Sequence, residues 1–241
     1  MEVSNDMKFS IALCLIVVSL IFGGWTTLAG DSSTNGQANV FLSLPTLPAD
    51  LKRVVVLPLA CDESSGPLAD GCQMFDPVLR AALIKTGRFE VVPASSDVLS
   101  RCTGKLTWTG EEVLPQDFFE SLRNVYGCDA VMFCQLSVLR GSPPLAIGWK
   151  LKLTDIKTGK ILWAADEIFD AGNLCVAKDA QQFEEKQRPR QGILYATYSD
   201  IAWWLNVPVR TALDDQWDIL HSPKYFGEYS AEKLLTTLPQ R

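Results

Sequence analysis

The chain has little histidine and no excess of positive charge. His221 is the single histidine among 241 residues. Because imidazole is the commonest neutral base and transition-metal ligand, this scarcity argues against histidine-based catalysis and against a multi-histidine metal site. The formal net charge is −6. Nucleic-acid binding needs a basic surface that displaces counterions, so we expect no nucleic-acid partner.

Motifs of common enzyme classes are also missing. The sequence contains no G-x-S-x-G nucleophile elbow, no glycine-rich phosphate loop and no H-E-x-x-H zinc motif. The remaining candidates are four carboxylates, which could bind calcium, bind a small ligand or act as an acid/base pair. They are Asp155, Asp166, Glu167 and Asp170.

These carboxylates have a simpler explanation. Asp166 and Glu167 are neighbours in a predicted strand, so their side chains point to opposite faces of the sheet. Charges at a strand end commonly discourage edge-to-edge pairing. We therefore predict no catalytic residue, no cofactor and no metal ligand. A secreted hydrolase, or a protein that binds a metal or small ligand, is the alternative.

Residues 1–29 have the features of an export signal. Residues 11–22 are apolar, and Thr27, Leu28 and Ala29 place small residues where a signal peptidase cleaves. A start at Met7 gives a cleaner basic region than a start at Met1. The alternative is an uncleaved membrane tether, because residues 9–28 are nearly long enough to span a bilayer, which takes about 20 residues. Either reading predicts an exported protein, periplasmic or associated with the cell envelope.

The cysteines also indicate an oxidising compartment. Of seven cysteines, only Cys14 lies in the apolar N-terminal segment, and the remaining six are an even number. Their spacing does not resemble a zinc knuckle or a C-x-x-C redox motif. A disulfide between Cys61 and Cys72 would close a segment rich in Asp, Ser, Gly and Pro. The alternative is that both are buried thiols.

Residues 51–171 have the pattern of an α/β domain. Residues 52–92 read as strand, helix, strand, which predicts a crossover between strands that are parallel if adjacent. Trp149, Leu151 and Leu153 alternate with polar residues, and a turn that ends at Gly159 follows. The expected fold class is α/β (α+β), a mixed β-sheet with crossover helices and a C-terminal β-hairpin.

Segments outside this domain have other characters. Residues 30–50 are polar and read as a linker, although the apolar island at residues 40–42 can add an edge strand. Residues 172–241 are expected to form a helical C-terminal extension that packs on the domain, with Ser222 capping the last helix and Pro223 in its first turn. Trp203 and Trp204 are candidate interface residues, because tryptophan favours wet apolar boundaries. The alternative is that one ring packs on the sheet and the other covers its edge.

Three segments carry a resemblance to a known group. They are TGRFEVV at residues 86–92, YGCDAVMF at residues 126–133 and DIKTGKILW at residues 155–163. Together they resemble the α/β domain shared by CsgG, LpoB and the N-terminal domain of TolB, over residues 52–170. This resemblance implies a periplasmic or outer-membrane-associated accessory domain that binds an envelope protein partner and is not an enzyme. A self-assembling structural subunit is a further alternative, and the oligomeric state stays open.

Overall fold

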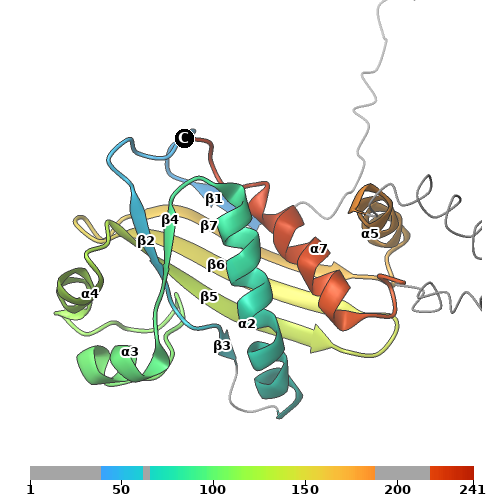
Figure 1. Ribbon diagram of the computed structural model, residues 1–241, viewed down its shortest axis with the longest axis horizontal. Helices are drawn as coiled ribbons and strands as arrows, with labels where there is room; N and C mark the ends of the chain where they lie inside the picture. Colours follow the sequence, from blue (N-terminus) through green and yellow to red (C-terminus); the bar gives the residue numbers. More distant parts are fainter. Residues whose placement is uncertain (1–38, 62–65, 188–217) are drawn as a thin grey trace, which may run out of the picture. The chain divides into compact units, whose positions relative to one another are not determined.

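The computed structural model describes residues 39–61, 66–187 and 218–241. They form a seven-stranded mixed sheet of order β1-β7-β6-β5-β2-β4, with β3 beside β5 (Figure 1). The strands are β1 (Asn39–Leu42), β2 (Arg53–Val56), β3 (Ala60–Cys61), β4 (Glu90–Pro93), β5 (Ala130–Arg140), β6 (Ala146–Asp155) and β7 (Ile161–Asp170). The helices are α2 (Gly66–Thr86), α3 (Ser96–Thr103), α4 (Phe118–Tyr126), α5 (Leu174–Gln187) and α7 (Pro223–Leu235). The expected fold class is therefore confirmed.

The parallel part of the sheet is centred on β2. This strand pairs in parallel with β4 on one side and with β5 on the other. Val54, Val55 and Val56 are all at most 1% exposed, because helices cover both faces of the sheet here. A strand buried on both faces has no need of polar alternation, which explains the unbroken run of valines.

The antiparallel part runs from β5 through β6 and β7 to β1, and the hairpin of β6 and β7 lies at its centre. Trp149, Leu151 and Leu153 are at most 2% exposed, so the alternation predicted from the sequence is confirmed. The turn has Gly159 at φ 66°, a conformation that suits glycine. Asp155 stabilises the turn, since its Oδ2 accepts a hydrogen bond from the backbone N–H of Thr158 at 3.0 Å.

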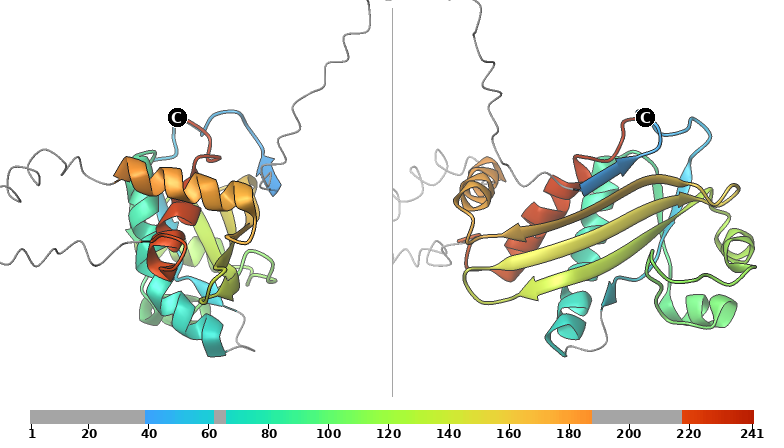
Figure 2. Two further views of the ribbon diagram at one scale, coloured as in Figure 1. Left: turned by 90° about the vertical axis from the view of Figure 1, so that its right-hand side faces the viewer. Right: turned by 180° about the vertical axis from the view of Figure 1, so that it is seen from behind.

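Two hydrophobic clusters lie on opposite faces of the sheet. The larger one joins β5, β6 and β7 to α2 and α7, which lie side by side on one face (Figure 1). Its centre holds Trp149 and Phe75, whose rings meet edge to face at 5.9 Å between centroids. The smaller cluster joins Val55, Leu57 and Phe133 to α3 and α4 at one end of the other face (Figure 2).

Helix α2 begins earlier than its sequence suggests. Because proline favours the first turn of a helix, a start at Asp76 and Pro77 is expected. That expectation is wrong: the helix starts at Gly66, and Pro77 lies inside it. Phe75 is fully buried against the sheet, and Cys72 is bonded to Cys61 of β3. These tertiary contacts hold the early turns despite the proline, which is unfavourable inside a helix.

Several expectations concern residues outside the described ranges. They include the export segment at residues 1–29, residues 30–38 of the expected linker, and the pair Trp203 and Trp204. Of the remaining linker residues, 39–42 form β1 and Leu47 is buried. In the described ranges, no helix is both long enough and apolar enough to span a bilayer.

Candidate functional site

The sheet ends on one side in a short apolar strand. Phe41, Leu42 and Leu44, in and just after β1, have exposed fractions of 54%, 48% and 50%. We call these three residues the β1 edge. Single exposed apolar residues are ordinary on protein surfaces, but three within four positions of an edge strand form a local concentration.

Backbone pairing fixes the position of the β1 edge. Strand β1 is antiparallel to β7, and Phe41 lies opposite Ala164. Val40 packs against the larger hydrophobic cluster, so Phe41 projects from the opposite face of the sheet. After the strand, the N–H of Ser43 donates to the carbonyl of Leu162 at 3.1 Å.

The other edge of the sheet is built differently. Strand β4 ends in Pro93, which has no N–H to offer an incoming strand. It begins with Glu90, whose carboxylate is 3.1 Å from Nε of Arg53. Proline and charge are the usual protection of an exposed edge. Residues 39–44 have neither, and β7 is the only described strand that pairs with β1.

The sheet face that carries Phe41 is only partly covered. The connector at residues 104–117 crosses it, where Lys152 Nζ donates to the carbonyl of Gly110 at 2.6 Å and Lys150 Nζ lies 2.9 Å from Glu111. Helices α3 and α4 cover the end near β2, and much of β6 and β7 is open in the view from behind (Figure 2). Ile168, 55% exposed, lies on this open face.

The structure separates the four carboxylates considered from the sequence. The Asp155 carboxylate accepts a hydrogen bond within its own turn. Asp166 lies 3.8 Å from Lys150 on the open face. Asp170 binds Arg140 at 2.6 Å. Glu167 lies in register with Trp149, on the face that α7 covers. Within the described ranges, no group of three or more His, Cys, Asp or Glu side chains is arranged to hold a metal ion.

Glu167 lies near a small polar cluster between α5 and α7. Asp179 Oδ2 accepts a hydrogen bond from Tyr229 at 2.9 Å and lies 2.6 Å from Lys233 Nζ. Burial raises the pKa of Glu167, and Lys233 only partly offsets this. Burial would also raise the pKa of Asp179, but its bonds to Lys233 and Tyr229 outweigh burial and lower it. The cluster joins α5 to α7 and offers no nucleophile.

Most of the described cysteines and the histidine lie in a disulfide, in the core or at the surface. Cys61 and Cys72, the pair that the sequence singled out, are joined in a disulfide with Cα atoms 6.4 Å apart. Cys128 and Cys134 are buried, while Cys175 is exposed. His221 Nδ1 lies 2.5 Å from Oδ2 of Asp218, and the side chain is 65% exposed.

The sequence only partly revealed the β1 edge. The apolar island at residues 40–42 predicts an edge strand, and that strand is confirmed. Its exposure was not predicted, because burial depends on which strand or helix lies outside β1. The usable signal was the absence of Lys, Glu and Pro from residues 39–44, where an edge strand normally carries them.

Comparison with known proteins finds only weak similarities to solved structures. No family model and no curated protein matches the sequence. A PelC dodecamer structure from Paraburkholderia phytofirmans is 13% identical, covers 85% of this chain and 98% of its own, and has a TM-score of 0.45. The lipoprotein GNA1162 from Neisseria meningitidis is 16% identical, with 64% and 98% covered and a TM-score of 0.36.

LpoB, one of the proteins that the sequence resembles, is also among these structures. Its C-terminal domain from Salmonella enterica is 21% identical, covers 49% of this chain and 82% of its own, and has a TM-score of 0.33. All three likenesses are below 25% identity and below a TM-score of 0.5. The chain is therefore similar to these three bacterial proteins at a low level. The similarity assigns it neither a family nor a function.

Proposed function

We propose that this protein is exported to a bacterial cell envelope and acts there as a non-catalytic accessory protein, through contact with a partner protein. The observation that carries the proposal is the difference between the two edges of the sheet. The β4 edge has Pro93 and Glu90 as protection, whereas the β1 edge exposes Phe41, Leu42 and Leu44 with no charge near them in sequence.

An extended segment of the partner protein fits this edge. A strand that adds to β1 would satisfy the outward N–H and C=O groups of β1, and alternate side chains would contact Phe41 or Leu42. Because residues 39–44 carry no charge, the complementary segment is also apolar and uncharged. Ile168 is a separate exposed apolar residue of the same face, because Asp166 lies between it and Ala164, the residue opposite Phe41.

Two further features support the envelope as the compartment. Residues 11–22 and the small residues at 27–29 have the pattern of an export signal, with an N-terminal membrane tether as the variant reading. The disulfide between Cys61 and Cys72 suits an oxidising compartment. The sequence resemblance to CsgG, LpoB and TolB points to the same place. The pair Trp203 and Trp204 is proposed as a second contact surface.

Site-specific photo-crosslinking in cells tests the proposal. A photoreactive phenylalanine analogue replaces Phe41 or Leu44, and in control cells it replaces Val113, which is 95% exposed. We expect one reproducible adduct with an envelope protein from positions 41 and 44 and none from position 113. Phe41→Lys in the chain labelled at Leu44 should abolish that adduct, because a lysine blocks strand addition.

Other outcomes of the same experiment discriminate between functions. Adducts only with a second copy of the chain would replace the accessory role by the self-assembling subunit. Equal adducts from positions 41 and 113, or an adduct that survives Phe41→Lys, would refute the β1 edge as the contact. The dispersed carboxylates give the hydrolase and metal-binding alternatives no support.

A further inference from the structure

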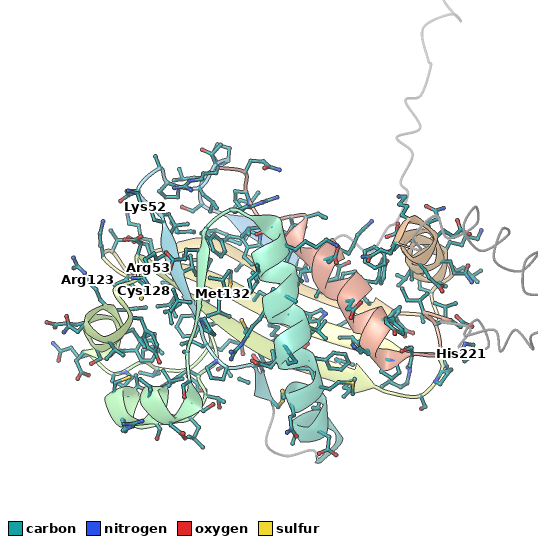
Figure 3. The ribbon with its side chains drawn as sticks, viewed as in Figure 1. Lys52, Arg53, Arg123, Cys128, Met132 and His221 are labelled. Carbon is teal, nitrogen blue, oxygen red and sulfur yellow. A yellow bond between two sulfur atoms is a disulfide. The ribbon has the colours of Figure 1, made fainter. Side chains whose placement is uncertain are left out.

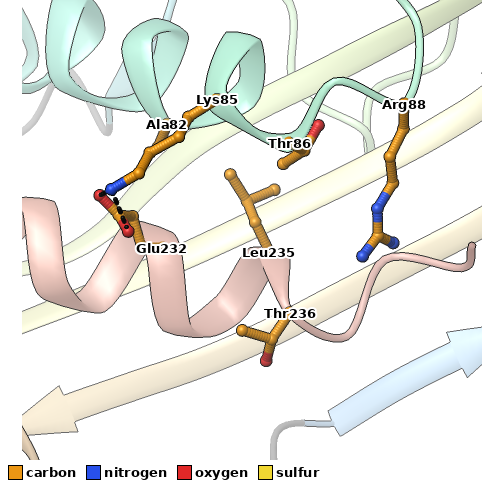
Figure 4. Close-up of a pocket in the computed structure, with 7 residues that line it drawn as sticks. All are labelled: Ala82, Lys85, Thr86, Arg88, Glu232, Leu235 and Thr236. Carbon is orange, nitrogen blue, oxygen red and sulfur yellow. Dashed lines mark hydrogen bonds and ion pairs between the residues drawn. The ribbon is translucent and has the colours of Figure 1, made fainter.

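A small cavity lies between the C-terminal ends of α2 and α7. Its volume is about 170 Å³, so it can hold several water molecules or one small ligand group. Charged side chains and two threonines surround an apolar surface from Ala82 and Leu235 (Figure 4). The full lining is Ala82, Lys85, Thr86, Arg88, Glu232, Leu235 and Thr236.

The charges in this cavity do not balance. Lys85 Nζ donates to both carboxylate oxygens of Glu232, at 2.8 and 2.9 Å, so these two side chains neutralise each other. Arg88 is the third charged group of the lining. The cavity therefore has a net charge of +1, located at the guanidinium group.

Arg88 differs from comparable arginines of the domain. Arg53 and Arg80 are also half-buried, and each has a carboxylate, from Glu90 at 3.1 Å and from Asp76 at 2.9 Å. In contrast, Arg88 Nη1 donates to the carbonyl oxygen of Pro239 at 2.7 Å and forms no ion pair with any described residue. A half-buried cation without an anion is unfavourable, because burial removes hydration that a single carbonyl oxygen only partly replaces. Burial accordingly lowers the pKa of Arg88.

The remaining hydrogen-bonding groups of the cavity suit an oxyanion. Beyond the bond to Pro239, the guanidinium has further N–H groups in a planar fork, which matches carboxylate and phosphate geometry. Thr86 and Thr236 hydroxyls already donate to the carbonyls of Leu83 and Lys233, each at 2.7 Å. The donors left for a ligand are therefore those of Arg88 and the third N–H of Lys85.

We propose that this cavity binds a small ligand through a single oxyanion group, a carboxylate or a phosphate, held mainly by Arg88. Lys85 provides a second donor at the other side. Ala82 and Leu235 contact a short apolar portion of the ligand. The β1 edge contributes nothing to this cavity, so the site stands independently of the proposed protein partner.

Ligand-dependent thermal unfolding of the full chain, kept in an uncharged detergent, tests the site. The probes are sodium acetate and inorganic phosphate, each compared with sodium chloride at equal ionic strength. For a probe at ten times its dissociation constant, we expect a saturable rise of the midpoint by about 3–6 °C above chloride. At equal concentrations of the two probes below saturation, a larger rise with phosphate identifies a phosphoryl group, and an equal or larger rise with acetate identifies a carboxylate.

Two variants decide whether Arg88 is responsible. Arg88→Gln should lose the ligand-dependent rise, but it also loses the bond to Pro239. Thr236→Glu keeps that bond and places a carboxylate in the cavity, so it should equally lose the rise. Arg123→Gln, which changes an exposed arginine on α4, should keep it. A rise no larger than with chloride, or one that persists in Thr236→Glu, would overturn the site.

Discussion

Asp129 and Arg53 are joined by two hydrogen bonds that run in opposite directions. The Asp129 carboxylate accepts from the backbone N–H of Arg53 at 3.0 Å, and the N–H of Asp129 donates to the carbonyl of Arg53 at 2.9 Å. The same carboxylate oxygen accepts from the N–H of Lys52 at 2.9 Å. Lys52, Arg53 and Cys128 lie at this end of the sheet (Figure 3). The carboxylate thus fixes the start of β2 to the start of β5.

Asp129→Asn should lower the free energy of unfolding at pH 7. Loss of the charge weakens two hydrogen bonds, and we expect a decrease of about 1–2 kcal/mol, because Asp129 is partly exposed. Urea denaturation measures this difference. Asp70→Asn, at an exposed position of α2, is the matched control and should stay within about 0.5 kcal/mol of the parent chain.

The stabilisation by Asp129 should also depend on pH. Burial raises the pKa of Asp129, but the N–H groups of Arg53 and Lys52 and the nearby lysines outweigh burial, so the pKa lies below its usual value. A lowered pKa in the folded state gives stability that is complete above the unfolded pKa of about 3.9 and is lost as pH falls through the folded value. The difference between parent and Asn variant should therefore shrink below about pH 4. A constant difference down to pH 2 would contradict this assignment.

Gly227→Ala should destabilise the domain, although alanine is the better helix former. A Cβ atom at Gly227 would lie 2.7 Å from Cδ1 of Phe75, where α7 crosses α2. Overpacking of this kind costs about 1–3 kcal/mol, which exceeds the helix-propensity gain of about 1 kcal/mol over most of that range. Gly66→Ala is the control, because nothing lies within 4 Å of its added Cβ. A stabilised Gly227→Ala would show that α2 and α7 are farther apart.

Ser230→Ala should leave a buried donor without an acceptor. Trp149 Nε1 donates to Ser230 Oγ at 2.8 Å, and both residues are fully buried. We expect a loss of about 1–3 kcal/mol, the usual cost of a buried unsatisfied group. Trp149→Phe removes the donor, so Ser230→Ala should cost less in that background. A double-mutant cycle measures the coupling, and strictly additive losses would argue against the bond.

Alkylation of the native chain should discriminate among the thiols. Burial raises the pKa of Cys128 to about 11 and also raises the pKa of Cys134 well above its usual value. Cys175 is exposed. Iodoacetamide at pH 8, followed by peptide mass spectrometry, should label Cys175 and spare the two buried thiols until urea unfolds the chain. Early labelling of Cys134 would contradict its position in the core.

Reduction of the Cys61–Cys72 disulfide should lower stability by about 3 kcal/mol, from the loop-closure entropy of a segment of this length. Urea denaturation with and without reductant measures the loss. The control is the double variant that carries both Cys61→Ser and Cys72→Ser. Its free energy of unfolding should not change with reductant. If the parent chain is equally insensitive, the two cysteines are free thiols in solution.

The hairpin and the buried strand could be predicted because their signals are local. The alternation at Trp149, Leu151 and Leu153 reports one wet and one buried face directly. The start of the last helix could also be predicted, because Ser222 and Pro223 form a recognisable helix start. Ser222 is the residue that precedes α7.

The start of α2, the exposure of the β1 edge and the cavity near Arg88 could not be predicted in this way. The first turns of α2 depend on the disulfide and on Phe75, whose partner Trp149 is far along the chain. The cavity near Arg88 is lined by residues that are far apart in sequence, such as Lys85 and Glu232, which meet between two helices although 147 residues separate them. No local sequence pattern identifies an arginine that forms no ion pair, because this depends on every residue that packs around the arginine in the folded chain.

The position of α7 has a consequence for how the chain folds. This helix is the last element, yet it covers the centre of the sheet: Ser230 meets Trp149 across 81 residues, and Thr237 meets Trp163 across 74. Such distant contacts slow folding, because a long loop must close before they form. Until α7 has emerged, the face of β6 and β7 that it covers stays uncovered. For the proposed export, in which a chain crosses a membrane before it folds, this delay is an advantage.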